Sequence, residues 1–409
     1  MRIHQASDLH RQIEKLPRVQ RFLSSLKRNS INTSNGYKTP IAYFHEFLLS
    51  NYNQTADSIL QMLVNKEVDV YSLLDEFIGF IQTKQINPSS IIQYITGIRS
   101  YLSYNDIDIV PAKFKRRVRI PKIYSEEEEP IDANDIRHLI LNLHNRRLKA
   151  FILILASSGL RASEACAIRF CDVDFTTRPT RIHVRKEYAK TRVSRDVWIS
   201  DEATKYLRDW LVFKYGNDIL KILDSDSDSN NSNNDANRNK SARNRLTQTL
   251  IFQVQLNNDH VTPKSLYLKI LIQFQKLLEI AGFDEKKEGM ARRKITFHSF
   301  RRFVKTILSD NIGKEYSEWY LGHAKSGYYV NKPEVRAATY AEKAMKYLTF
   351  LDYTTLEAKG KSIEAKLQEK DREIFSIKEK YENDLREMRE EMETKFQQIL
   401  AKIDIAKVK

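Results

Sequence analysis

Cysteine and long apolar runs are scarce in this chain of 409 residues. Its two cysteines, Cys166 and Cys171, lie close together, and no second pair completes a zinc site, so we interpret them as buried free thiols in a reducing, intracellular setting. The apolar run "AFILILA" is too short to cross a bilayer, and the N-terminal "MRIHQASDLHRQIEK" lacks the apolar core of a signal peptide. These absences predict a soluble cytoplasmic protein with no membrane partner.

Positive charge, by contrast, is abundant. The chain has 68 Lys and Arg against 53 Asp and Glu, which gives a formal net charge of +15. Such an excess favours a polyanionic partner, with nucleic acid before an anionic membrane surface. A charge that serves solubility alone is the plain alternative. The hydrophobic content of 41%, with 20 Tyr and 19 Phe, supports folded cores.

Two breaks in composition divide the first 355 residues. Residues 111–131 are rich in proline, first basic and then acidic, which is typical of a linker. Apolar residues at helical spacing before it, as in "VYSLLDEFIGFIQTK", predict an all-helical domain over 1–110. Residues 224–245 hold no aliphatic side chain larger than alanine, so we interpret them as a disordered insertion in a second domain, 132–355. A further domain boundary is the alternative.

The third break precedes a long amphipathic segment, 356–409. Glu, Lys, Arg and Gln dominate it, and apolar residues recur in steps of three, four and four at Ile374, Ile377, Tyr381, Leu385, Met388, Met392, Phe396, Ile399 and Ile403. This eleven-residue period predicts a long helix with a nearly straight or slightly right-handed seam. One helix cannot bury such a stripe, so we expect a coiled coil with another copy or packing on the protein's own body. A solvated single helix is the alternative.

Several basic residues stand at distinctive positions between the linker and the last helix. In "SSGLRASEACAIRF", Gly159 ends an apolar helix, so Arg161 projects from a rigid corner. In "FHSFRRF", His298 and Arg301 are three apart and share one helix face. His323 follows a glycine in "LGHAKS".

A β-hairpin is predicted for "RIHVRKEYAKTRVSRDVWIS", with Lys190 in its turn. Taken singly, each basic residue also has a structural interpretation. Arg161 could cap a helix or pair with Glu164, His298 could be a satisfied, half-buried histidine, and Lys190 could be a solvated turn lysine.

Taken in order, "GLRASE", Lys190 in a hairpin turn, "HSFRR", "LGH" and a following tyrosine resemble the tyrosine recombinase, or phage integrase, family. The stretch "KTRVSRDVWI" is similar to the family's segment from a catalytic lysine to an arginine and an apolar strand. The likeness covers about 132–352, and the ending "MKYLTFLD" with its helical tail looks more like archaeal members than bacterial Xer proteins. It implies a mainly α fold with a small β-sheet (α+β): a helical core-binding domain, a catalytic domain and a C-terminal coiled-coil helix.

The resemblance also implies roles for these residues. Two guanidiniums, Arg161 and Arg301, grip the non-bridging oxygens of a phosphodiester. His298 and His323 donate further hydrogen bonds, and His298 could help to remove the phenolic proton. Lys190 protonates the departing 5′-oxygen. The covalent 3′-phosphotyrosine keeps the bond energy, so no nucleotide cofactor is expected. Because the arginines stabilise the charge, no metal is expected either.

The nucleophile is left open among three tyrosines. The family's tyrosine usually lies about nine residues after the Gly-His histidine, where this chain has Lys332. We rank Tyr329 first, Tyr328 close behind, and Tyr340, within a predicted helix, third. Phe300 also stands where the family usually has leucine.

The expected partners are duplex DNA and other copies of the chain, assembling into a tetramer at synapsis. The linker would place five basic residues near phosphates: Lys113, Lys115, Arg116, Arg117 and Arg119. A charged, solvated tether is the alternative. Two rival functions also remain, a type IB topoisomerase that relaxes DNA and a catalytically silent DNA-binding protein that oligomerises through its last helix.

Overall fold

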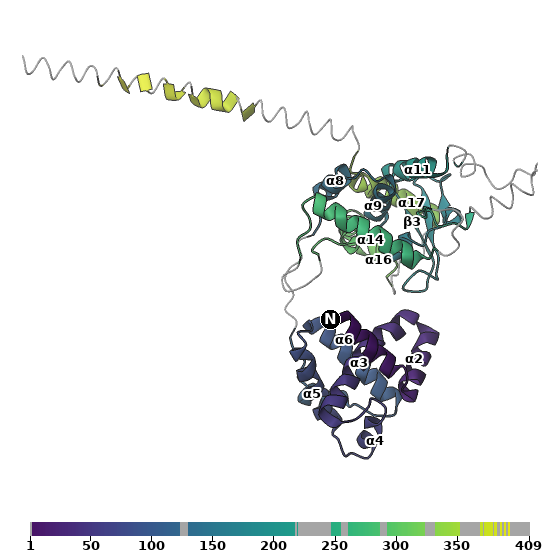
Figure 1. The fold of residues 1–409 in the computed structure, drawn as a ribbon. Coiled ribbons are helices and arrows are strands. Elements are labelled where there is room, and N and C mark those ends of the chain that lie inside the picture. Colours follow the sequence, from purple (N-terminus) through teal and green to yellow (C-terminus); the bar gives the residue numbers. More distant parts are fainter. Residues whose placement is uncertain are drawn as a thin grey trace, which may run out of the picture. The chain divides into compact units, whose positions relative to one another are not determined.

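The computed structural model describes residues 2–122, 130–216, 219, 247–254, 261–286, 293–323 and 332–351, together with most positions from 369 to 389 and residue 392. It separates into two compact units, Met1–Glu128 and Glu129–Lys409 (Figure 1). Within the described ranges, no helix has both the length and the apolar character needed to span a bilayer.

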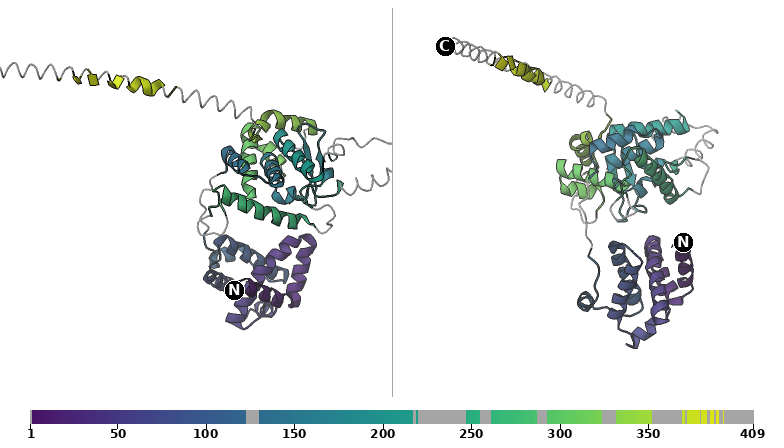
Figure 2. Two further views of the ribbon diagram at one scale, coloured as in Figure 1. Left: turned by 45° about the horizontal axis from the view of Figure 1, so that its top comes forward. Right: turned by 60° about the vertical axis from the view of Figure 1, so that its left-hand side comes forward.

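The first unit is built from helices, as the apolar spacing predicts (Figure 2). The bounds of its elements are α1 Arg2–Ile13, α2 Pro17–Asn29, α3 Ile31–Tyr52, α4 Ile59–Val64, α5 Val70–Thr83, α6 Pro88–Tyr104 and α7 Pro111–Arg117. Short polar side chains cap the N-termini of several helices. Ser30 accepts a hydrogen bond from Thr33 N at the start of α3, and Asp69 accepts one from Ser72 N at the start of α5. Aromatic rings fill the core, with Phe44 packed edge-on to Phe77.

The structure differs from the sequence prediction at the expected linker. Residues 111–117, within the expected linker, form α7, and Phe114 is buried in the core of the first unit. Arg117 donates two hydrogen bonds to Asp69, at 3.1 and 2.8 Å, and Arg119 N donates one to Asp75. Charge pattern alone missed this helix because a single apolar side chain anchors it. The five basic residues expected near phosphates, from Lys113 to Arg119, are nevertheless exposed.

The second unit surrounds one buried helix, α9 (Arg146–Ser158) (Figure 1). Apart from Lys149, every residue from 147 to 158 is buried, and the run "FILILA" within it is accordingly apolar on all sides of the helix. The helices that contact it are α8 (Ala133–Leu141), α10 (Ala162–Ala165), α11 (Asp201–Tyr215), α14 (Pro263–Ile280) and α15 (Phe297–Asn311). Two further helices, α16 (Lys314–Tyr320) and α17 (Pro333–Lys343), and two 3-10 turns, η1 (Phe170–Asp172) and η2 (Met345–Leu348), complete the unit.

The predicted hairpin is confirmed and belongs to a three-stranded antiparallel sheet. The strands are β1 (Val173–Asp174), β2 (Arg181–Val184) and β3 (Arg195–Trp198), in that order. Ile182 pairs with Val197 and Val184 with Arg195, so one face of the hairpin packs into the core. The overall class, mainly α with a small sheet, is as expected.

Two further predictions concern the insertion at 224–245 and the C-terminal helix. The proposed insertion, 224–245, lies outside the described residues. Between 369 and 392 the described residues are helical, and the apolar stripe from Ile374 to Met392 is exposed by 40 to 68%. The pairing of this helix in a coiled coil stays a prediction.

Candidate active site

Arg161 stands at a corner made by Gly159, as the sequence predicts. Gly159 follows α9 with a φ of 62°, in the left-handed region that favours glycine. A Cβ there would lie 2.7 Å from Leu321 Cδ2 and 3.0 Å from Val304 Cγ1, so the corner is tightly packed against α15 and the end of α16. Arg161 then caps α10 with an extended backbone and a partly exposed side chain.

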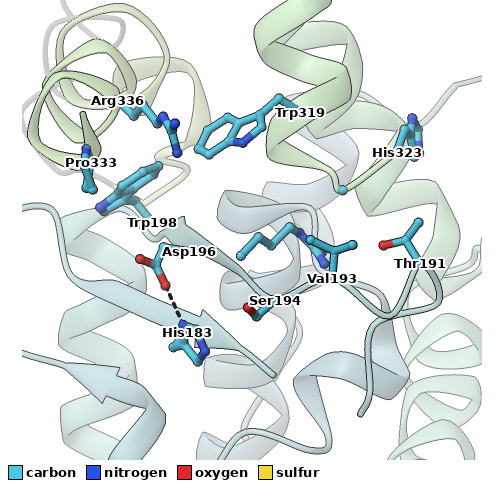
Figure 3. Close-up of a pocket in the computed structure, with 12 residues that line it drawn as sticks. His183, Thr191, Val193, Ser194, Asp196, Trp198, Trp319, His323, Pro333 and Arg336 are labelled. Atoms are coloured by element: carbon cyan, nitrogen blue, oxygen red, sulfur yellow. Dashed lines mark hydrogen bonds and ion pairs between the residues drawn. The ribbon is translucent and has the colours of Figure 1, made fainter. Parts of the chain in front are cut away.

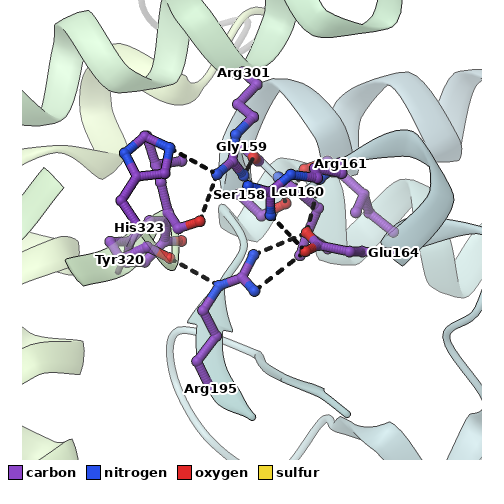
Figure 4. A network of polar contacts seen from close by, with 11 residues as sticks. Ser158, Gly159, Leu160, Arg161, Glu164, Arg195, Arg301, Tyr320 and His323 are labelled. Atoms are coloured by element: carbon purple, nitrogen blue, oxygen red, sulfur yellow. Dashed lines mark hydrogen bonds and ion pairs between the residues drawn. The ribbon is translucent and has the colours of Figure 1, made fainter. Parts of the chain in front are cut away.

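Arg301 contacts the same corner from α15 (Figure 4). It lies on α15, is only 3% exposed, and donates hydrogen bonds to the carbonyl oxygens of Gly159, at 2.7 Å, and Leu321. Burial, and then the nearby positive charge of Arg161, lower the pKa of Arg301 to about 9. The structure thus brings the two predicted arginines together.

His323 completes the cluster. Its Nε2 lies 3.3 Å from Arg301 Nη2, and its Nδ1 contacts the carboxylate of Glu318. The side chain of His323 is 34% exposed, so the imidazole remains partly accessible from solvent although both ring nitrogens have partners.

Glu164 binds both Arg161 and a third arginine, Arg195, for which the sequence alone predicted no role. The Glu164 side chain is fully buried and accepts hydrogen bonds from Arg161 Nη1 and Arg195 Nη2, each at 2.8 Å. Burial alone raises the pKa of Glu164, but Arg195 and then Arg161 outweigh it and hold the pKa below its usual value. The structural interpretation of Arg161, an ion pair with Glu164, is therefore correct and compatible with a functional one.

Arg195 connects the sheet to the cluster. It lies on β3, is buried, and donates through Nε to the carbonyl oxygen of Tyr320 at 3.1 Å. The sequence could have indicated that Arg195 is buried, because the alternation of side chains along a strand places it on the same inward face as Val197. A buried arginine needs a carboxylate, and Glu164 is the one it contacts.

Lys190 and His298 are exposed at the positions predicted for them. Lys190 lies in the turn between β2 and β3, and His298 lies one helical turn before Arg301. A pocket brings the hairpin and His323 together, because Thr191 and Val193, just after Lys190, line it with His323, Trp319 and Arg336 (Figure 3). The turn that carries Lys190 therefore faces the same hollow as the histidine.

The three candidate tyrosines differ in what the structure says of them. Tyr328 and Tyr329 lie outside the described residues. Tyr340 is fully buried on α17, where its hydroxyl donates to Ser157 O at 2.9 Å and its ring stacks on Tyr320 at 5.7 Å. Burial raises the pKa of Tyr340 well above its usual range, so this hydroxyl is a poor nucleophile in the fold. Within the described ranges, no three His, Cys, Asp or Glu side chains form a group suited to a metal ion.

Comparison with known proteins agrees with this geometry. Residues 129–328 match the phage integrase family, so this part of the chain is similar to members of that family. It is 24% identical over 195 residues to tyrosine recombinase XerA of Saccharolobus solfataricus and 29% identical over 201 residues to tyrosine recombinase XerC of Listeria welshimeri. These alignments cover 47% and 46% of this chain and 61% of each relative, so the chain spans less than two thirds of their length.

Solved recombinase structures are also similar, at low identity. A crystal structure of XerA recombinase matches 81% of this chain and 95% of that one, with 19% identity and a TM-score of 0.34. XerH site-specific recombinase bound to its difH substrate matches 86% of this chain and 83% of that one, with 15% identity and a TM-score of 0.48.

Proposed function

We propose that this protein is a site-specific DNA recombinase that cleaves and rejoins duplex DNA through a covalent 3′-phosphotyrosine. The observation that carries the proposal is the meeting of Arg161 and Arg301, from two distant parts of the chain, at one corner with His323. A strongly lowered arginine pKa beside a second arginine is typical of functional sites, and two guanidiniums suit the binding of a phosphate. The family and its tyrosine recombinase relatives support the same activity.

The arrangement suits attack on a phosphodiester. A tyrosine oxygen forms a bond to phosphorus, the bond from phosphorus to the 5′-oxygen breaks, and the leaving oxygen takes a proton from Lys190. The phenolic proton passes to a base, for which His298 is our candidate. Arg161, Arg301 and His323 offset the negative charge that grows on the non-bridging oxygens. Reversal by a new 5′-hydroxyl rejoins the strand, so the bond energy is conserved.

Strand exchange requires several protomers on DNA. We infer that copies of the chain assemble into a tetramer at synapsis and that the C-terminal helix contributes contacts between them. The exposed basic residues of α7 and its exit, 113–119, are positioned on the surface of the first unit as phosphate-binding residues should be. This substrate would place the protein at the nucleoid in the cytoplasm.

The test is a trapped covalent intermediate. Because the target sequence is unknown, a library of nicked duplexes with randomised cores serves as suicide substrate, and covalent protein–DNA species are recovered and sequenced. We expect an adduct from the wild-type protein and none from Arg161→Ala or Arg301→Ala. Arg146→Ala, an exposed arginine at the other end of α9, is the matched control and should keep the adduct.

Three outcomes separate the candidate functions. An adduct followed by exchange between two duplexes supports a recombinase. An adduct with relaxation of supercoiled DNA but no exchange would replace the proposal with a type IB topoisomerase. Binding with no adduct from any library member would leave a catalytically silent DNA-binding protein.

A further inference from the structure

The turn that ends α16 places Glu318 and His323 against each other. Gly322 has a φ of 69°, and its N–H donates to Trp319 O at 2.8 Å. His323 N donates to Glu318 O at 2.9 Å, so the pair of hydrogen bonds forms a Schellman motif. In this motif the side chains at positions 318 and 323 meet, and the contact is commonly apolar. Here it joins a carboxylate to an imidazole.

Both oxygens of the Glu318 carboxylate are used. One accepts from His323 Nδ1, and the other accepts from Lys305 Nζ on α15 at 2.8 Å. The hydrogen bond from Lys305, and then that from His323, keep the pKa of Glu318 below its usual value, so the carboxylate is ionised at neutral pH. Lys305 thereby fixes the rotamer of Glu318, and Glu318 fixes the ring of His323.

This contact also sets the proton positions on the imidazole. A carboxylate can only accept, so Nδ1 carries the proton. Nε2 lies 3.3 Å from Arg301 Nη2, which can only donate, so Nε2 accepts while no substrate is bound. Both nitrogens are thus assigned by their partners, and Nε2 is directed at Arg301.

We propose that Glu318 is a positioning residue for catalysis: it holds His323 with Nδ1 protonated and Nε2 directed at the phosphate site, and Lys305 secures it. The inference rests on the proposed function. When a phosphate occupies the site, the ionised carboxylate stabilises an imidazolium whose second proton, on Nε2, is donated to a non-bridging oxygen. Glu318 itself does not touch the substrate.

The test compares Glu318→Ala and Glu318→Gln with wild-type protein in single-turnover formation of the DNA adduct. Carboxylates that orient a histidine at metal sites typically account for about 10- to 100-fold in activity, and we expect Glu318→Ala to lose about as much in rate constant. DNA affinity should be unchanged, because Glu318 makes no phosphate contact. Glu318→Gln should recover part of the rate, since its amide oxygen still accepts from Nδ1 but carries no charge.

A second measurement is independent of catalysis. Imidazole ¹⁵N shifts distinguish the two neutral tautomers, and the His323 signal is assigned by its loss in His323→Asn. We expect the Nδ1-protonated form in the wild-type protein and a shift toward the Nε2-protonated form in Glu318→Ala. Glu315→Gln, which removes a carboxylate from the same helix, is the matched control and should leave both rate and tautomer unchanged.

Different outcomes test the role of Glu318 and the proposed function. A wild-type rate in Glu318→Ala, a loss of rate matched by an equal loss of DNA affinity, or an Nε2-protonated His323 in wild-type protein would each overturn the inference. Failure of the wild-type protein to form any adduct would instead contradict the proposed function, and the tautomer would then decide whether Glu318 positions His323.

Discussion

Arg301 donates a hydrogen bond of 2.7 Å to the carbonyl oxygen of Gly159, although 142 residues separate them. One arm of the guanidinium is therefore fixed by backbone, at a corner whose shape depends on a left-handed residue. The same guanidinium reaches Leu321 O and His323, so the end of α16 is held to that corner as well. The geometry of the cationic cluster is set by main-chain positions more than by pairs of side chains.

Gly159→Ala should disturb that corner in two ways. A residue other than glycine at this φ costs about 1–2 kcal/mol, and the added Cβ would also meet Leu321 and Val304. We expect a larger loss in the free energy of unfolding, measured by urea denaturation, than for Gly282→Ala, together with loss of DNA cleavage. Gly282 has a φ of 72° with nothing within 4 Å of its Cβ position, so it isolates the backbone cost. Equal losses in the two variants would show that crowding at Gly159 is unimportant.

Arg195→Leu should destabilise the second unit. Glu164 would keep Arg161 but lose two of its hydrogen bonds, and breaking a buried ion pair on one side typically costs about 3–5 kcal/mol. The double variant Arg195→Leu with Glu164→Leu should recover part of this free energy, because no buried charge is left unpaired. Denaturant unfolding of the three variants measures the coupling. A double variant no more stable than Arg195→Leu would argue against the uncompensated charge as the cause.

Acid should weaken the first unit through His45. This side chain is 4% exposed, and its Nδ1 accepts a hydrogen bond from Ala56 N at 3.2 Å, which requires the neutral ring. Burial lowers the pKa of His45 in the folded state, so the unfolded chain binds more protons below about pH 6.5. The stabilisation is complete above that pH and is lost as the pH falls toward the folded-state pKa.

Amide exchange at Ala56 reports this local effect. The opening free energy of that amide should decrease from pH 7 to pH 5 in the wild-type protein. It should vary less in His45→Asn, whose amide oxygen can accept the same hydrogen bond without titrating. A decrease of the same size in both proteins would assign the pH dependence to another group.

The candidate tyrosines can be separated by removing single hydroxyls. Tyr329→Phe should abolish the covalent adduct, whereas Tyr328→Phe should retain it. Tyr340→Phe should also retain the adduct but lower the free energy of unfolding by about 1–3 kcal/mol, because Ser157 O loses its donor in the core. Mass spectrometry of the trapped peptide names the attached residue directly. Adduct formation at full rate by Tyr329→Phe would show that our ranking is wrong, while the family assignment would stand.

Deleting the residues after Gly360 should weaken assembly on DNA but leave cleavage of a single half-site intact. A point variant refines this test: Ile377→Lys places a charge on the apolar stripe, and Ser376→Lys places one on a neighbouring exposed position. Only the first should reduce the assembled species in analytical ultracentrifugation of the protein–DNA complex. Unchanged synapsis in the truncated protein would exclude the helix as a contact between protomers.

Local patterns in the sequence predicted much of this protein. The period of the apolar residues gave the helices of the first unit, alternation gave the β2–β3 hairpin, and a single glycine located the corner that presents Arg161. These features depend on residues within one or two turns of each other, so they can be read along the chain. The helix α7 was missed because its basic and proline residues masked one buried phenylalanine.

By itself, then, the sequence predicted a mainly α fold with a small sheet. Its resemblance to a known family selected the two arginines, the histidines and the lysine of the candidate site, and their roles stay predictions. Only the tertiary structure showed that Glu318 contacts His323 and that Glu164, besides Arg161, also binds Arg195. Arg195 reaches Glu164 across 31 residues, and Tyr340 reaches Ser157 across 183, so burial and pairing at these positions depend on packing between distant segments. Tyr340 carries a hydroxyl that could act as a nucleophile, but it is packed as a core residue. Burial raises the pKa of this hydroxyl and keeps it protonated.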